Sequence, residues 1–296
     1  MKVLITDNIN KCVKDIISET AEAVFLPTMS EEEIIKIIGE YDALMVRSQT
    51  KVNRNIIESG KKLKIIGRAG VGVDNIDVNS ATEKGIIVVN SPDGNTIAAS
   101  EHTIALMLAI SRNIVPASQS TKEGKWNRDA FTGTELFGKT LGVMGFGRIG
   151  RKVVNIALSI GMKVIVYDPF ANEETVNKAC ALYETSLDNF LKTLDYLSIH
   201  IPKTSDTINI INKENINKMK KGAIIINCSR GGLVNENDLK EALENGQISA
   251  AAIDVYENEP KIETCPLIHY NGNNIILTPH LGASTKEAQI NVALDV

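Results

Sequence analysis

Short runs of Val, Ile and Leu alternate along the chain with amphipathic stretches of helical spacing. Apolar residues that recur every three to four positions predict helices; these cover 31–40, 53–60 and 151–160. The uninterrupted apolar runs predict buried strands; these cover 2–7, 42–48, 63–70, 85–92, 141–147, 162–168, 194–202, 222–229, 248–256 and 273–280. Strands that alternate with helices are typical of parallel sheets with crossover helices.

The strand-and-helix pattern starts afresh at residue 141, so the chain is predicted to hold two α/β units in series. Between them, residues 96–126 are apolar on most helical faces as far as Pro116. A helix that is apolar nearly all round is usually buried, so we interpret this stretch as a connecting helix. Its apolar excess over 100–120 also predicts the interface of a homodimer.

Composition and charge narrow the classes of partner. The chain has 296 residues, 43% of them hydrophobic and 23% charged, with a formal net charge of −4. No basic face is therefore expected to bind nucleic acid or an anionic membrane. The apolar part of MKVLITDNIN is too short for a signal peptide, and no run approaches the ~18 apolar residues of a spanning helix. We expect a soluble, cytoplasmic protein.

The cysteines give no sign of a metal site or of a disulfide framework. They lie at positions 12, 180, 228 and 265, without Cys-x-x-Cys spacing and without a paired histidine motif. Reduced thiols and no bound metal are expected from this spacing.

A glycine-rich turn follows the run at 141–144. Gly145, Gly147 and Gly150 have the spacing G-x-G-x-x-G between a predicted strand and a predicted helix. Such a turn admits a pyrophosphate at the helix N-terminus, although a glycine turn can also be purely structural. The next strand ends in Asp168, which suits the ribose hydroxyls of NAD and would repel the 2′-phosphate of NADP. The alternative for Asp168 is a turn cap before Pro169.

Three further residues follow predicted strands and carry chemistry. Arg230 comes after the run 222–227, where its guanidinium suits a carboxylate, although a surface salt bridge is the alternative. His280 ends the last strand, and a carboxylate such as Glu259 would fix its tautomer for proton exchange. The spacing alone does not bring these two together. The other histidines are expected to be structural; they are His102, His200 and His269.

Six motifs, in order along nearly the whole chain, resemble the D-2-hydroxyacid dehydrogenases. They are GVGVDNID at 70–77, NSPDGNT at 90–96, GFGRIG at 145–150, CSRGG at 228–232, DVYENEP at 254–260 and TPHLGAST at 278–285. Within that family, the stretches 45–52, 68–77 and 126–142 are most similar to the D-3-phosphoglycerate dehydrogenases. The resemblance implies a Rossmann-type NAD-binding domain, 98–282, inserted into a flavodoxin-like substrate domain formed by 1–97 and 283–296. It also implies an active site in the cleft between the two domains.

The resemblance assigns roles to particular residues. It implies a catalytic triad of Arg230, Glu259 and His280. It implies an NAD site, with Asp254 on the nicotinamide carboxamide and the backbone of residues 148 and 149 on the pyrophosphate; its residues are Gly145, Gly147, Arg148, Ile149, Gly150, Asp168, Ile201, Pro202, Cys228, Ser229, Asp254 and Gly282. The implied substrate site consists of Arg47, Ser48, Arg68, Gly70, Val71, Gly72, Arg128, Arg230 and His280.

Three of the arginines bear on a phosphorylated substrate. A phosphate ester carries nearly two negative charges, so its site should gather cations besides Arg230. Arg47 and Arg68 end predicted strands of the first unit, and Arg128 lies in a segment able to reach the neighbouring subunit of a dimer. For Arg128 the alternative is a solvated loop charge.

The implied activity is NAD-dependent oxidation of D-3-phosphoglycerate to 3-phosphohydroxypyruvate, with a small 2-hydroxy acid as the only partner besides a second subunit. Two alternatives stay open: a reductase for glyoxylate, hydroxypyruvate or another 2-keto acid, and a non-catalytic NAD-sensing protein of the same fold. After His280 the family has a long helix that crosses back, whereas only 284–296 remain here. The last helix is short or the chain is cut, and feedback by serine through a regulatory C-terminal domain is not expected.

Overall fold

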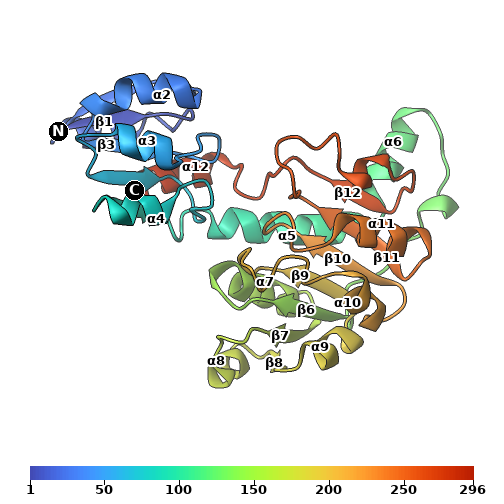
Figure 1. Ribbon diagram of the computed structural model, residues 1–296. Coiled ribbons are helices and arrows are strands. Elements are labelled where there is room, and N and C mark those ends of the chain that lie inside the picture. Colours follow the sequence, from blue (N-terminus) through green and yellow to red (C-terminus); the bar gives the residue numbers. More distant parts are fainter. The chain divides into compact units, whose positions relative to one another are not determined.

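A computed structural model describes all residues, Met1–Val296, and divides them into two compact units. The first unit is Met1–Asn95 together with Ala283–Val296, and the second is Thr96–Gly282. Each unit is built on its own parallel sheet, of five and seven strands respectively (Figure 1). The predicted fold class, two doubly wound parallel-sheet domains with one inserted into the other, is confirmed.

The first unit has the strand order β2-β1-β3-β4-β5, which is the flavodoxin-like order. Its elements are β1 (Lys2–Ile5), α1 (Val13–Ser18), β2 (Glu22–Phe25), α2 (Glu31–Ile37), η1 (Ile38–Glu40), β3 (Ala43–Val46), α3 (Arg54–Ser59), β4 (Ile65–Arg68), α4 (Val78–Glu83), β5 (Ile87–Asn90) and α12 (Lys286–Asp295). Side chains of α2, α3 and α4 pack on one face of the sheet, and those of α1 and α12 pack on the other.

The second unit has the order β12-β11-β10-β9-β6-β7-β8, the Rossmann order with a seventh strand added at one edge. Its elements are α5 (Thr96–Ser111), α6 (Ile114–Lys122), η2 (Asp129–Phe131), β6 (Thr140–Met144), α7 (Arg148–Ser159), β7 (Lys163–Tyr167), α8 (Glu173–Lys178), β8 (Leu182–Tyr183), α9 (Leu187–Thr193), β9 (Tyr196–Ile199), α10 (Lys213–Lys218), β10 (Ala223–Asn227), α11 (Glu236–Glu244), β11 (Ile248–Ile253), η3 (Pro266–His269) and β12 (Ile275–Leu277).

Two apolar cores cover the faces of the seven-stranded sheet. Side chains of α5 and α7 form one core, and those of α9, α10 and α11 form the other. Successive residues of a strand point to opposite faces, so Val143 lies in the first core and Met144 in the second. The central strands β9 and β10 are buried along their whole length, which explains why their sequences are apolar except for Ser198 and Asn227.

The structure differs from the sequence-based prediction in several elements; the short helices α1, α4, α8, α9, α10 and α11 were not predicted. The edge strands β2 and β8 were not predicted; neither contains a buried residue, and β8 has only two residues. The single connecting helix predicted over 96–126 is instead two helices, α5 and α6. Asn113 between them adopts a left-handed backbone with φ 51°, and this conformation ends the first helix.

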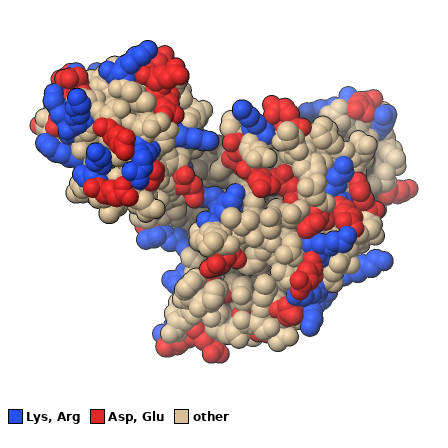
Figure 2. Space-filling view, in the orientation of Figure 1, with Lys and Arg blue, Asp and Glu red and all other residues tan.

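The surface carries charges of both signs. On the face shown in Figure 2, Lys and Arg side chains are interspersed with Asp and Glu on each unit, without a continuous basic area. None of the helices is both long and apolar enough to span a bilayer.

Candidate active site

His280 and Glu259 form a direct pair. His280 Nδ1 lies 2.6 Å from Glu259 Oε2, and the other oxygen of the same carboxylate accepts the Tyr256 N–H at 2.7 Å. The imidazole is 45% exposed and the carboxylate 30% exposed. A carboxylate that engages Nδ1 fixes the tautomer and orientation of the ring, so Nε2 is the nitrogen available for proton exchange.

The loop that carries His280 is held in an uncommon conformation by Asp254. His280 has φ 56°, in the left-handed region that a residue with a side chain adopts only when its surroundings impose it. Its N–H donates to the Asp254 carbonyl at 2.9 Å. The Asp254 carboxylate accepts the N–H groups of Leu281 at 2.8 Å and Gly282 at 2.9 Å, and the Thr278 hydroxyl at 2.6 Å.

Asp254 remains ionised although it is completely buried. Burial raises its pKa, but hydrogen bonds from His102, Thr278 and Leu281 outweigh that effect and hold the pKa below its usual value. The carboxylate is therefore a fixed negative charge at the end of β11.

Arg230 lies in the turn after β10, the strand adjacent to β11. Its guanidinium Nη1 donates to the Ser229 carbonyl at 2.8 Å, and its own carbonyl accepts from the buried Asn227 side chain at 3.0 Å. A Cβ at Gly231 would overlap the carbonyl oxygen of Tyr256. Close approach at this glycine brings the Arg230 turn against the loop that leads to Glu259.

The surroundings of the three glycines after β6 differ. Gly145 has φ 99°, and a Cβ there would lie 2.5 Å from the His200 carbonyl oxygen. A Cβ on Gly150 would overlap the Gly145 carbonyl oxygen, whereas nothing lies within 4 Å of a Cβ on Gly147. The turn is thus tight, open at its middle glycine and closely packed against its helix, as in dinucleotide-binding turns.

Arg148 and Ile149 begin α7, and no side chain caps this helix N-terminus. Asp168 follows β7 and accepts the Phe146 N–H at 2.7 Å on one oxygen and the Phe170 N–H at 2.9 Å on the other. The structure therefore joins the predicted acid to the middle of the glycine turn.

The other predicted cofactor residues lie at neighbouring strand ends. Ile201 and Pro202 follow β9, and the Ser229 hydroxyl donates to the Ile201 carbonyl at 2.8 Å. Cys228 comes directly after β10 and is partly buried. Burial, with a contribution from the Asp254 charge, raises the pKa of its thiol to about 12. At neutral pH the thiol keeps its proton.

In the first unit, a buried aspartate holds the loop that carries Arg47. Asp7 follows β1 and is 4% exposed. Its carboxylate accepts the N–H groups of Arg47 and Thr50, each at 2.9 Å, and the Thr50 hydroxyl at 2.6 Å. This loop follows β3, the neighbour of β1 in the sheet, and the strand order reverses between these two strands, which is where open sheets bind ligands. Burial lowers the pKa of Arg47, and the charge of Asp7 opposes that shift.

The remaining predicted substrate residues are placed as follows. Arg68 ends β4, and its guanidinium covers Gly70, where a Cβ would lie 2.7 Å from Arg68 Cζ. The Val71 carbonyl accepts from Asn90 at 2.6 Å. Gly72 is partly exposed and Ser48 is exposed. Arg128 is exposed and belongs to the second unit, whereas Arg47 and Arg68 belong to the first.

Comparison with protein families identifies the second unit. Residues 104–282 match the model of the D-isomer specific 2-hydroxyacid dehydrogenases, NAD binding domain. The chain belongs to this family. NAD, the predicted cofactor, is confirmed at the level of the family, because the matched domain is its NAD-binding domain.

Individual relatives span different lengths. The D-3-phosphoglycerate dehydrogenase of Synechocystis sp. is 52% identical over 296 residues, which is 100% of this chain and 52% of that protein. The chain thus spans about half the length of the curated relatives with this name. The hydroxypyruvate reductase of Thermotoga maritima is 47% identical over 90% of this chain and 86% of its own length.

Solved structures of the family have the same fold. The D-lactate dehydrogenase from Aquifex aeolicus, complexed with NAD and lactic acid, has a TM-score of 0.88 at 28% identity. The match covers 99% of this chain and 92% of that one.

Four residues that support these sites were not predicted from the sequence. Glu236, 9% exposed, accepts the Glu257 N–H at 2.8 Å and so steadies the loop before Glu259. Asn75 donates to the carbonyls of Arg47 and Thr50, at 2.6 and 2.7 Å. The other two are Asp7 and His102. Their partners lie 21 to 152 residues away, and nothing in local spacing signals such contacts.

Proposed function

We propose that this chain catalyses the NAD-dependent oxidation of D-3-phosphoglycerate to 3-phosphohydroxypyruvate. The observation that carries the proposal is the His280–Glu259 pair, 2.6 Å apart, within a family NAD-binding domain. The similarity to curated D-3-phosphoglycerate dehydrogenases supports the choice of substrate.

His280 is the proposed acid and base. Its Nε2 takes the proton of the C2 hydroxyl as the C2 hydrogen leaves with its electron pair, and the 2-hydroxy acid becomes a 2-keto acid. Glu259 stabilises the imidazolium that forms and returns the ring to the same tautomer. In the reverse direction the same imidazolium protonates the C2 oxygen.

Arg230 is the proposed electrostatic clamp. Its guanidinium holds the substrate carboxylate and polarises the C2 oxygen, where negative charge develops during reduction. The backbone of Gly70, Val71 and Gly72 is the proposed second support for that carboxylate, because glycines permit close approach.

The residues present fit NAD. The open position at Gly147 and the backbone of Arg148 and Ile149 at the N-terminus of α7 suit a pyrophosphate, and Asp168 suits ribose hydroxyls. Asp254 has a further lone pair on Oδ2 for the carboxamide. When bound, the nicotinamide supplies the hydride acceptor. We also propose a preference for NAD over NADP, since DPFANEE has no basic residue after Asp168. Equal kcat/KM with both cofactors would contradict this preference.

A homodimer formed through the second unit is also proposed. Large apolar side chains are exposed on α5, on α6 and in the segment that follows them; they are Leu108, Ile114, Val115, Trp126 and Phe137. An exposed apolar patch of this kind is typical of an interface. Sedimentation at micromolar concentration tests this proposal, and a monomer would contradict it.

The decisive experiment compares 3-phosphohydroxypyruvate with hydroxypyruvate, using NADH. The unmodified chain should have the higher kcat/KM with the phosphorylated acid. If the arginine binds phosphate, replacing Arg47, Arg68 or Arg128 by Met should lower kcat/KM for that acid. The expected loss of transition-state stabilisation is ~1.5–3 kcal/mol, with little change for hydroxypyruvate.

Equal losses on both acids in all three variants would leave the second candidate, a hydroxypyruvate reductase. The 86% coverage of the Thermotoga maritima enzyme favours that candidate over the other reductases. NAD binding without turnover of either acid would identify a non-catalytic NAD-binding protein.

A further inference from the structure

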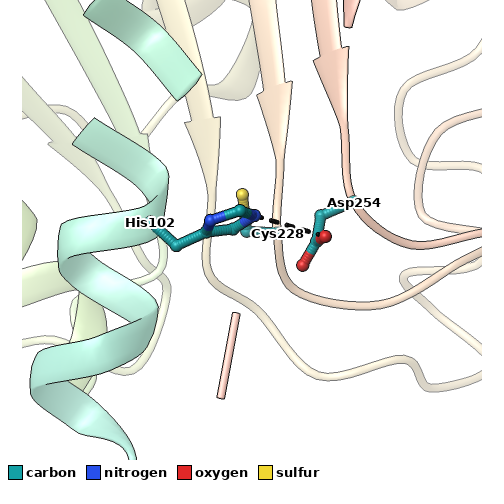
Figure 3. A group of neighbouring side chains, drawn as sticks. All are labelled: His102, Cys228 and Asp254. Atoms are coloured by element: carbon teal, nitrogen blue, oxygen red, sulfur yellow. Dashed lines mark ion pairs between the residues drawn. The ribbon is translucent and has the colours of Figure 1, made fainter. Parts of the chain in front are cut away.

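Three side chains of different chemistry converge at the carboxyl edge of the second sheet. His102 reaches from α5, Cys228 follows β10 and Asp254 follows β11. Their donor atoms all lie within 4.8 Å of one another. Figure 3 shows the imidazole directed at the strand ends, with the sulfur beside the ring and the carboxylate across from its nitrogen.

We propose that His102, Cys228 and Asp254 form a binding site for a thiophilic divalent cation of the zinc class. A nitrogen, a sulfur and a carboxylate oxygen are the protein ligands that zinc uses, and three of them leave a fourth position open. The cadmium ion, which is softer, fits the same donor set.

The separation of His102 and Asp254 fits a bridging cation. His102 Nε2 lies 3.3 Å from Asp254 Oδ1. A charge-assisted hydrogen bond between such groups usually measures about 2.7–2.9 Å. Two ligands of one tetrahedral zinc ion, at ordinary bond lengths, lie about 3.4 Å apart. The observed pair is thus already spaced as two vertices of a zinc tetrahedron.

The sulfur completes the set with a small movement. A sulfur and a nitrogen on the same zinc ion lie about 3.6 Å apart. Since no two donors are more than 4.8 Å apart, the largest possible separation exceeds the sulfur–nitrogen spacing on zinc by about 1.2 Å. On coordination the thiol releases its proton to solvent and binds as thiolate.

The carboxylate is oriented in the manner of a metal ligand. Thr278, Leu281 and Gly282 donate three hydrogen bonds to Asp254, at 2.6 to 2.9 Å, and these fix the orientation of the carboxylate. Outer hydrogen bonds of this kind fix ligating carboxylates in known metal sites. The cation would also offset the negative charge of a completely buried carboxylate.

The sequence separations conceal the site. The three residues lie 126 and 26 positions apart along the chain, so none of the usual metal-ligand spacings is present. The proposal therefore goes against the expectation, drawn from cysteine spacing, that the chain holds no metal.

Occupation has a functional consequence, and this consequence alone rests on the proposed cofactor roles. Cys228 and Asp254 belong to the proposed NAD site, with Asp254 on the carboxamide. A cation held between them would occupy that place. Metal and NAD should therefore bind competitively, so that zinc inhibits turnover and NAD protects against it.

The test uses cadmium and the ultraviolet charge-transfer band of a cadmium–thiolate bond. Cys12 and Cys180 are exposed, so the reference protein carries Cys12→Ser and Cys180→Ser. Titration of this protein, free of NAD, should give the band with a single equivalent of cadmium. Adding Cys228→Ser should abolish the band, and adding His102→Gln should weaken cadmium binding ~10-fold or more. Near-ultraviolet circular dichroism and a thermal melt verify that each variant is folded.

Each outcome decides a separate point. Absence of the band, or a band that survives Cys228→Ser in folded protein, would overturn the metal site. A titration that NAD does not shift would overturn the competition. If cadmium binds as expected but neither 2-keto acid is reduced, the metal site stands and the proposed function fails.

Discussion

Asp7 and Asp254 occupy equivalent places in the two units. Each follows a parallel strand, β1 or β11, and each holds the loop after the adjacent strand, β3 or β12. Each carboxylate accepts two backbone N–H groups and a threonine hydroxyl from that loop. Each loop presents one side chain of the proposed chemistry, Arg47 in the first unit and His280 in the second.

The two loops differ in the further side chains that lie beside them. Near Asp7, the Asn75 amide ties the loop from its carbonyl side. Asp254 instead has an imidazole 3.3 Å away and a thiol nearby. The comparison teaches that a buried carboxylate is sufficient to fix a loop after a parallel strand. Asp7 holds its loop without an imidazole beside it, whereas His102 and Cys228 add metal-ligand chemistry to the carboxylate of Asp254.

The largest effect is expected on kcat, from substitution of His280, and it distinguishes the role of this loop from that of the loop that carries Arg47. His280→Asn should lower kcat ~10²–10⁴-fold, because the positioned acid and base is lost. NAD affinity, measured by calorimetry, should persist. Arg47→Met, on the loop held by Asp7, is the matched control and should act mainly on KM for the phosphorylated acid. A His280→Asn protein with near-normal kcat would remove His280 from the mechanism.

Removal of the Asp254 carboxylate tests how much this group contributes to the free energy of unfolding. Asp254→Ala leaves two N–H groups and a hydroxyl without their acceptor, together with an unpaired imidazole. The free energy of unfolding in urea should fall by about 3–5 kcal/mol, as for other broken buried charge networks. Because the His280 loop loses its support, kcat should fall too. A change below about 1 kcal/mol would mean that packing alone holds the loop.

Asp7→Ala should cost less, about 2–4 kcal/mol, because Asn75 still holds the loop. Its kinetic signature should also differ: KM for 3-phosphohydroxypyruvate should rise, while kcat and the kinetics with hydroxypyruvate stay near normal. The double variant Asp7→Ala with Arg47→Met should then be hardly worse than Arg47→Met on the phosphorylated acid. If the losses of kcat/KM from the two substitutions were additive, Asp7 would not act by positioning Arg47.

The smallest expected effect is on the pH dependence of stability, through His200 at the end of β9. His200 follows β9, donates or accepts at the Ser198 hydroxyl at 2.7 Å, and has its pKa lowered by burial to about 4. Between pH 6.5 and 4 the unfolded chain binds a proton that the folded chain does not, so stability falls as the pH falls through that window.

His200→Gln should remove about 2 kcal/mol of the stability difference between pH 7 and pH 5. Urea unfolding at both values measures it, and the exposed His269, changed to Gln, is the control. Identical pH slopes in the two variants would show that His200 titrates normally.

The sequence predicted the central strands because they are buried on both faces and therefore mostly apolar, as in β9 and β10. It missed β2 and β8, which lie at the edges of their sheets and have no buried residue. The break at Asn113 was missed because a single left-handed residue interrupts a helix without altering its apolar pattern.

For the site, spacing identified the glycine turn and Asp168, since both belong to one local βαβ unit. Motifs marked His280 and Glu259, but only the fold brought their side chains together. Asp7 lies 40 residues from Arg47, and Glu236 lies 21 from Glu257. Supporting contacts across strand ends depend on the order of strands in the sheet, and one sequence does not determine that order.

The proposed triad has a consequence for how substrate range can diversify. Arg230, Glu259 and His280 all belong to Thr96–Gly282, whereas Arg47 and Arg68 belong to the other unit. The chain crosses between the units only twice, after Asn95 and after Gly282. A recombination event or a designed graft at these two crossings would exchange Arg47 and Arg68, two of the three arginines proposed to bind phosphate. The hydride and proton transfer machinery would be inherited whole.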